Sequence, residues 1–210
     1  MAAVLPVARL PEPPAGAEEG EGEAPEAEAQ PEGGQYVFQA TRRGLVKKTR
    51  LDAFSRPRPS GIIALSIEEG DRLIAARMTN GRSHILLSTA QGMAIRFEES
   101  DVRPMGRTAY GVKGITLEPG AAVVSAESLA AAAEGAPAPT ILTVTANGYG
   151  KRTELGEYRV QSRGGKGIIT IKTTEKNGRV VAIAQVSKDD EILLITGNGK
   201  ILRTRAKDIA

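Results

Sequence analysis

The chain has 210 residues, of which 40% are hydrophobic and only 3% aromatic, and it contains neither Cys nor Trp. The absence of Cys excludes disulfides, thiolate metal ligands and cysteine nucleophiles. The net charge of +3 hides an asymmetry, because residues 1–35 hold eight Glu and one Arg (−7) while the remainder carries +10. An acidic segment beside a basic body favours a polyanionic partner, either nucleic acid or an anionic membrane.

The N-terminal region divides into two parts. Residues 1–10 contain a short apolar stretch, and residues 11–35 are almost entirely Pro, Glu, Ala and Gly, which predicts an acidic disordered linker. No apolar run approaches the roughly 18 residues that span a bilayer. The first residues also lack the charged and apolar regions of a secretory signal, so we expect a cytoplasmic protein without a membrane partner.

Four related segments follow, beginning at Tyr36, His84, Thr140 and Glu191. In each, a β-prone run leads to Thr at the sixth position and Gly at the ninth, and the glycines Gly44, Gly92, Gly148 and Gly199 are 48, 56 and 51 residues apart. A unit of about fifty residues with four predicted strands is typical of a propeller blade. The sequence therefore predicts an all-β, propeller-like fold with blades of about four antiparallel strands at residues 36–83, 84–139 and 140–190, and the start of a further blade at 191–210.

Glycines mark the predicted turns within each unit. Asn147-Gly148 and Asn198-Gly199 predict type I′ hairpin turns, in which both central residues have positive φ. A second glycine precedes a later strand in three copies, at Gly61, Gly114 and Gly167. The Ala-rich stretch 126–139 lengthens the second unit and is interpreted as a loop insertion.

Basic residues recur in phase with the repeat. A cation stands four residues after the repeat glycine in every copy, and we call these four the register cations: Lys48, Arg96, Arg152 and Arg203. In blades related by rotation, equivalent residues lie on the same rim, which predicts a basic belt for the phosphates of duplex DNA. Aromatic and amide side chains for reading or stacking bases are scarce nearby, which favours sequence-independent binding.

The predicted DNA-binding set comprises the register cations and further cations of the same strands and of the loops that follow them. Its members are Lys47, Lys48, Arg50, Arg56, Arg58, Arg96, Arg103, Arg107, Lys113, Lys151, Arg152, Arg159, Arg163, Lys166, Arg203 and Arg205. For any one of them the alternative is an ordinary solvated face or a protected sheet edge. Reversing Lys48, Arg96 and Arg152 to Glu is expected to abolish duplex binding with little effect on thermal stability.

The stretch "SRGGKG" (162–167) leaves two interpretations open. Lys166 is followed by Gly167 and a strand-like run, so the stretch is not a nucleotide-binding P-loop, which requires a following Ser or Thr and a helix. Its glycines could admit an anion to backbone N–H groups flanked by Arg163 and Lys166, or they could form a sharp turn.

The segments "ATRRGLVKKT", "DVRPMGRTAYGVKGI" and "TANGYGKRTELGEYRVQSRGGKGIITIKTTEKNGRVV" resemble the C-terminal domain of DNA gyrase A subunits. The resemblance covers about residues 1–7 and 35–210. It implies a β-pinwheel, a disc of strand-swapped blades whose perimeter wraps duplex DNA and supports negative supercoiling. The implied partners are double-stranded DNA, the gyrase B subunit, and the rest of the gyrase A subunit; the implied location is the nucleoid. Residues 161–167, "QSRGGKG", are similar to the family's Q-R-R-G-G-K-G box but differ at Ser162.

The resemblance also sets the expected extent of the chain. Residues 1–10 correspond to the end of a preceding blade, and the blade number implies an incomplete disc, that is, a fragment. Two alternatives stay open: the corresponding domain of a topoisomerase IV subunit, and a non-enzymatic propeller that serves as an interaction scaffold.

No catalytic, metal or cofactor site is expected in this chain. By the same resemblance, the cleavage tyrosine lies in an upstream domain, so Tyr36, Tyr110, Tyr149 and Tyr158 are interpreted as structural. His84 is the single histidine and has no evident partner for acid–base or metal chemistry. The carboxylates of residues 189–191 are interpreted as a solvated turn.

Overall fold

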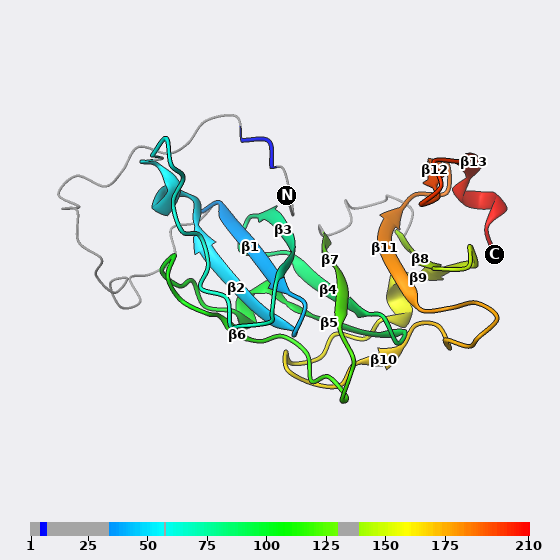
Figure 1. Cartoon of the computed structure of the whole chain (residues 1–210), viewed down its shortest axis with the longest axis horizontal. Helices are drawn as coiled ribbons and strands as arrows, with labels where there is room; N and C mark the ends of the chain where they lie inside the picture. Colours follow the sequence, from blue (N-terminus) through cyan, green and yellow to red (C-terminus); the bar gives the residue numbers. More distant parts are fainter. Residues whose placement is uncertain (1–4, 8–33, 57, 130–138) are drawn as a thin grey trace.

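A computed structural model describes residues 5–7, 34–56, 58–129 and 139–210 (Figure 1). Within these ranges every regular element is a β-strand or a 3₁₀ turn, and the strands form antiparallel sheets, which confirms the all-β prediction. Nearly all of the predicted acidic linker and most of the Ala-rich insertion lie outside the described residues. No helix among the described residues is long and apolar enough to cross a membrane.

Each repeat contributes a hairpin, a 3₁₀ turn and, in the first three repeats, a later strand that returns to the hairpin. The hairpins are β1 (Tyr36–Thr41) with β2 (Leu45–Arg50), β4 (His84–Thr89) with β5 (Met93–Glu98), β8 (Thr140–Thr145) with β9 (Gly150–Glu154), and β12 (Glu191–Ile195) with β13 (Ile201–Arg205). The returning strands are β3 (Leu73–Thr79), β7 (Val123–Leu129) and β11 (Val180–Val186). The 3₁₀ turns are η1 (Leu51–Phe54), η2 (Glu99–Asp101), η3 (Leu155–Glu157) and η4 (Ala206–Asp208).

A short strand in the long loop of the second repeat, and another in that of the third, joins the preceding blade. β6 (Val112–Lys113) lies in the second repeat but pairs with β2 of the first, and β10 (Ile168–Ile169) of the third repeat pairs with β5 of the second. The resulting sheet orders are β3-β1-β2-β6 and β10-β5-β4-β7. Successive blades are therefore linked by strand exchange, and Figure 1 shows them following one another along the length of the molecule.

The hairpin turns explain why Thr and Gly recur. In each hairpin the glycine N–H donates to the carbonyl of the repeat threonine three residues earlier, at 2.9–3.0 Å. Only the glycine of each turn has positive φ, for example +81° at Gly148, and no other described residue type does. The type I′ prediction for Asn147-Gly148 and Asn198-Gly199 is therefore wrong, because Asn147 and Asn198 do not adopt the required conformation.

A second family of glycines permits the strand exchange. Gly111 and Gly167 precede β6 and β10, have positive φ, and lie so close to the previous blade that an added Cβ would be 2.5 Å from the Val46 carbonyl oxygen and 2.3 Å from that of Ala94. Gly111, not Gly114, is thus the structural equivalent of Gly167. The sequence comparison that paired Gly114 with Gly167 was offset by three residues.

The hydrophobic core lies between blades. Phe38 and Val46 of the first blade pack with Ile85, Ile95 and Phe97 of the second. The second interface joins Leu86 and Ala94 to Ile141, Leu155 and Tyr158, and the third joins Leu142 to Ile192, Ala206 and Ile209. Each hairpin thus presents one apolar surface to the next, and this packing decides which side chains of a hairpin are accessible.

Candidate nucleic-acid interface

Lys47 is buried and bonded to backbone carbonyls. None of its surface is exposed, and its ammonium group donates hydrogen bonds to the carbonyl oxygens of Ala64, at 2.9 Å, and Arg107. Burial and the nearby Arg107 charge lower the pKa of Lys47 from 10.5 to about 8. The prediction that Lys47 contacts DNA is wrong, because its ammonium group already holds two loops together in the interior.

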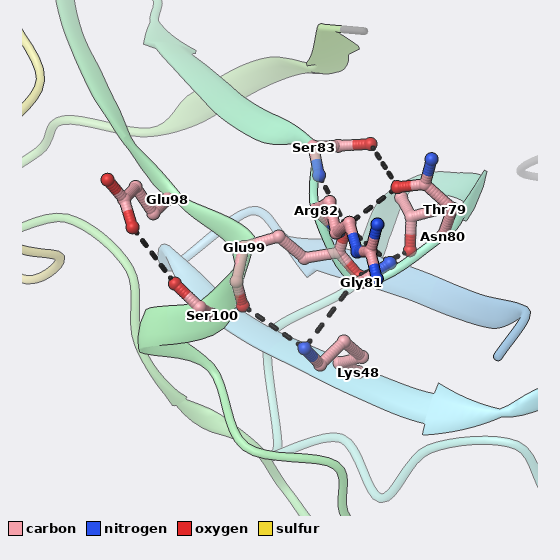
Figure 2. A network of polar contacts seen from close by, with 9 residues as sticks. All are labelled: Lys48, Thr79, Asn80, Gly81, Arg82, Ser83, Glu98, Glu99 and Ser100. Carbon is pink, nitrogen blue, oxygen red and sulfur yellow. Dashed lines mark hydrogen bonds and ion pairs between the residues drawn. The ribbon is translucent and has the colours of Figure 1, made fainter. Parts of the chain in front are cut away.

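Lys48 is equally inaccessible. Its Nζ atom donates to the Glu99 carbonyl oxygen at 3.2 Å and lies 3.8 Å from Glu99 Oε1 (Figure 2). It also sits 4.9 Å from the centre of the Tyr36 ring. Neither the lysine nor the glutamate side chain is exposed. Burial lowers the pKa of Lys48, and the Glu99 charge opposes that shift. Lys48 therefore makes an internal ion pair, and the prediction that it binds phosphate is also wrong.

The Glu99 carboxylate is the centre of a network that sequence reasoning missed. It accepts hydrogen bonds from the Thr79 hydroxyl at 2.7 Å and from the backbone N–H groups of Gly81, at 3.1 Å, and Ser83, at 3.2 Å (Figure 2). These groups come from the end of β3 and the turn that leads to β4, while Lys48 lies on β2. The carboxylate thus fixes the junction between the first two blades.

The next two register cations also point toward the following blade. Arg96 is half-buried, and its Nη1 donates to the carbonyl oxygens of Leu155, at 3.1 Å, and Tyr158, at 3.2 Å. Arg152 is half-buried as well, and its Nε donates to the Ile209 carbonyl oxygen at 3.1 Å. Three of the four register cations thus bind the next blade and only Arg203 is exposed, so a basic belt at this position stays a prediction, with Lys48 excluded from it by its burial.

His84 supports the Arg96 contact. The Arg96 Nε donates to His84 Nδ1 at 3.0 Å, so this imidazole nitrogen carries no proton. Burial and the adjacent Arg96 charge lower the pKa of His84, with Glu98 acting in the opposite direction. Burial likewise lowers the pKa of Arg96. His84 is therefore a neutral acceptor that orients the guanidinium group.

Ten cations of the predicted set are exposed. They are Arg50, Arg56, Arg58, Arg103, Lys113, Lys151, Arg159, Lys166, Arg203 and Arg205, whereas Arg107 and Arg163 are half-buried. Surface ion pairs between described residues include those of Arg50 with Asp52, Lys166 with Glu118, Arg203 with Glu191 and Arg205 with Asp208. Such pairs contribute little stability, and their cations remain near the surface.

Two exposed arginines occupy equivalent places in successive blades. Arg103 and Arg159 each come two residues after a 3₁₀ turn and directly before a residue that forms a bridge with the preceding blade, Pro104 with Lys48 and Val160 with Arg96. Neither makes an ion pair with any residue that the structure describes. We call Arg103 and Arg159 the loop arginines. Their spacing of 56 residues, equal to the interval between Gly92 and Gly148, is the sequence signal that pairs them.

Comparison with known proteins places this arrangement in a family. The family model described as "DNA gyrase C-terminal domain, beta-propeller" matches four segments, residues 35–80, 83–130, 139–187 and 190–210. Together these segments make up most of the chain. The chain belongs to the DNA gyrase C-terminal domain family.

Relatives of this DNA gyrase domain include the DNA gyrase A subunit of Salmonella typhimurium, 49% identical over 179 residues, which are 85% of this chain and 20% of the relative. The Pseudomonas aeruginosa protein of the same name is 46% identical over 193 residues, 92% of this chain and 20% of the relative. The chain thus spans about a fifth of the length of these relatives, as its resemblance to one domain of gyrase A subunits implied.

Two solved structures share the fold. A "DNA gyrase A C-terminal domain" structure has a TM-score of 0.73 and 29% identity over 86% of this chain and 58% of that one. The "C-terminal domain of DNA topoisomerase IV" has a TM-score of 0.77 and 28% identity over 84% of this chain and 54% of that one. The identities of 46–49% to gyrase A subunits, together with the family match, favour gyrase over topoisomerase IV.

The "SRGGKG" stretch of this gyrase domain packs on the preceding blade. The N–H of Gly164 donates to the Gly114 carbonyl at 2.7 Å, and the Gly165 carbonyl accepts from the N–H of Thr116 at 2.9 Å. Arg163 donates to the carbonyl oxygens of Asp101, at 2.9 Å, and Lys113, at 3.1 Å. These contacts favour the interpretation as a structural turn that docks one blade on another.

Tyrosines of the domain fall into two groups. Tyr36 and Tyr158 are buried, and the Tyr158 hydroxyl is hydrogen-bonded to Thr170. Tyr110 and Tyr149 are exposed. Among the described residues no group of three or more His, Cys, Asp or Glu side chains is arranged to hold a metal ion.

Proposed function

We propose that this domain binds duplex DNA without sequence preference and wraps it, and thereby supports negative supercoiling by a type II topoisomerase. Its partners would be the gyrase B subunit, together with the remainder of the gyrase A subunit, where strand cleavage and ATP hydrolysis would reside. The chain itself would need no cofactor and would act in the cytoplasm, at the nucleoid. Membership of the gyrase family and the basic surface support this proposal.

The loop arginines carry the argument. Arg103 and Arg159 are exposed, lack ion-pair partners among the described residues, and occupy equivalent positions in two blades. A repeated, unneutralised guanidinium is suited to successive phosphates of one duplex, since arginine binds phosphate oxygens through several N–H donors.

Other exposed cations extend this surface. Lys113 lies on β6, at the edge of the first blade's sheet, and its carbonyl accepts a hydrogen bond from Arg163 of the third repeat. Lys151 on β9 and Arg58 in the first long loop are exposed and likewise lack ion-pair partners within the described ranges. Weak contacts spread over several blades would follow the backbone of a curved duplex and would not read its bases.

Linking-number measurement tests wrapping directly. The 210-residue chain is incubated with relaxed circular DNA and a type I topoisomerase, and the DNA is then deproteinised and resolved by electrophoresis. Wrapping predicts a shift in linking number that grows with protein concentration. The shift should diminish when Arg103 and Arg159 are both replaced by Glu, and persist when Arg179, an exposed residue that is not in the predicted DNA-binding set, is replaced by Glu. Unchanged topoisomers with the wild-type chain would contradict wrapping and favour the scaffold alternative.

A further inference from the structure

We propose that the buried and half-buried register cations are positioning residues that fix the loop arginine of the next blade for phosphate contact. This inference rests on the proposed function. It assigns Lys48 to Arg103 and Arg96 to Arg159, so that each exposed cation is held by a less exposed cation of the preceding blade.

Arg96 forms hydrogen bonds with the backbone both before and after Arg159. Upstream of Arg159, the Arg96 guanidinium donates to the carbonyl oxygens of Leu155 and Tyr158 at 3.1 and 3.2 Å. Downstream, the Gln161 N–H donates to the Arg96 carbonyl at 2.8 Å, and Val160 forms a parallel bridge with Arg96. A single residue of the second blade therefore anchors both ends of the short segment that displays Arg159.

The same arrangement holds Arg103. Upstream, Lys48 donates to the Glu99 carbonyl oxygen at 3.2 Å. Downstream, the Met105 N–H donates to the Lys48 carbonyl at 2.8 Å, and Pro104 forms the equivalent bridge with Lys48. Because the two segments differ in sequence but share this double attachment, the attachment belongs to the repeat and not to one loop.

The third and fourth copies show what the contact depends on. Arg152 donates to the Ile209 carbonyl, and the residue equivalent to the loop arginines is Ala210, whose carbonyl accepts from the Arg152 N–H at 2.7 Å. Arg203 binds Glu191 of its own hairpin through its guanidinium group. The register cation thus contacts the 3₁₀ turn of the next repeat in each copy for which the described chain includes that turn.

A cation suits this role because it can donate to several carbonyls at once. The Leu155 carbonyl accepts the Tyr158 N–H at 3.1 Å and the Arg96 guanidinium as a second donor, and the same guanidinium also reaches the Tyr158 carbonyl. A guanidinium holds its donors in a rigid fork, whereas the Lys48 ammonium reaches one such carbonyl. Arg96→Lys should therefore retain part of the contact, and Arg96→Gln should lose it.

A double-mutant cycle between Arg96 and Arg159 tests the proposal. Duplex binding by the 210-residue chain is measured by fluorescence anisotropy for wild type, Arg96→Gln, Arg159→Gln and the double variant. If Arg96 acts through Arg159, Arg96→Gln should weaken binding about three- to tenfold in the wild-type background and have little effect once Arg159 is Gln. Arg96→Lys, which retains part of the contact, should lose less affinity than Arg96→Gln. In the control cycle, Arg179→Gln and Arg159→Gln should combine additively.

Hydrogen exchange reports the positioning without DNA. Exchange of the Gln161 amide, which donates to the Arg96 carbonyl, should accelerate in Arg96→Gln more than the amides of β4 do. Unchanged exchange at Gln161, or additive losses in the Arg96–Arg159 cycle while wild type binds DNA, would overturn the inference. Failure of the wild-type chain to bind duplex at low salt would instead overturn the proposed function, and the inference with it.

Discussion

The Lys48 ammonium group lies 3.8 Å from the Glu99 carboxylate, and neither side chain is exposed to solvent. Breaking such a pair leaves an uncompensated buried charge, which costs about 3–5 kcal/mol. Glu99→Gln should therefore lower the free energy of unfolding by roughly that amount, since it also places an amide N–H₂ against the N–H groups of Gly81 and Ser83. Urea unfolding measures the effect.

The control for this prediction is the variant that removes both charges. The double variant Lys48→Met, Glu99→Gln should lose less stability than the two single variants lose together, because it leaves no unpaired charge in the interior. A loss below about 1 kcal/mol for Glu99→Gln alone would contradict the network's structural role.

The buried Lys47 should make stability depend on alkaline pH. Its pKa is about 8 in the folded chain against 10.5 for an ordinary lysine. Between these pH values the unfolded chain binds the proton more tightly, so the stability of wild type relative to Lys47→Met should rise from about pH 8 to about pH 10.5 and stay constant below pH 8. Comparing urea unfolding of both proteins at pH 7 and pH 10 gives the change, expected on the order of 2 kcal/mol. A pH-independent difference would contradict the buried, charged state.

Alanine substitutions at Gly167 and Gly148 distinguish the cost of a left-handed backbone conformation from the cost of a steric clash with the neighbouring blade. Both have positive φ, at +80° and +81°, but a Cβ at Gly167 would lie 2.3 Å from the Ala94 carbonyl oxygen, whereas one at Gly148 would meet nothing within 4 Å. Gly148→Ala should cost about 1–2 kcal/mol through its left-handed conformation alone. Gly167→Ala should cost more, because β10 must move away from β5. Equal losses in urea unfolding would show that strand exchange tolerates the side chain.

Charge reversal should distinguish buried from exposed cations. Lys48→Glu places a carboxylate beside Glu99 in the interior and should prevent stable folding, whereas Arg103→Glu on the surface should change the free energy of unfolding by about 0.5 kcal/mol or less. Thermal unfolding followed by circular dichroism measures both. The sequence alone predicted that replacing Lys48, Arg96 and Arg152 by Glu would leave stability nearly unchanged, and the burial of Lys48 predicts the opposite. A Lys48→Glu chain that folds stably would contradict the structural prediction.

The repeat could be recognised from the sequence because its recurring residues serve the same backbone geometry in every hairpin. Thr and Gly recur since every hairpin uses the same turn hydrogen bond, and the β-prone runs recur since every hairpin is packed by its neighbours. The all-β fold and its similarity to gyrase C-terminal domains followed from that periodicity and from the matching segments. The turn type did not, because Asn-Gly serves more than one hairpin turn.

The orientation of the cations was not readable, for a different reason. Equal spacing shows that Lys48, Arg96 and Arg152 are structurally equivalent, but it does not show whether they face solvent or the next blade. Their acceptors are chiefly backbone carbonyls, which every residue has and which leave no pattern in the side chains. The loop arginines Arg103 and Arg159 belong to the predicted set. What sets them apart from its other members is the bridge that the next residue forms with Lys48 or Arg96, and only the structure shows that bridge.

The salt dependence of duplex binding tests the central claim most directly. The slope of log affinity against log salt reports the number of neutralised phosphates, at about 0.9 for each. Replacing Arg103 and Arg159 together by Gln should reduce the magnitude of this slope by about 1.8 if each contacts one phosphate, while Arg179→Gln leaves it unchanged. A slope that is the same in wild type and in the Arg103→Gln, Arg159→Gln double variant would show that the loop arginines do not bind the duplex.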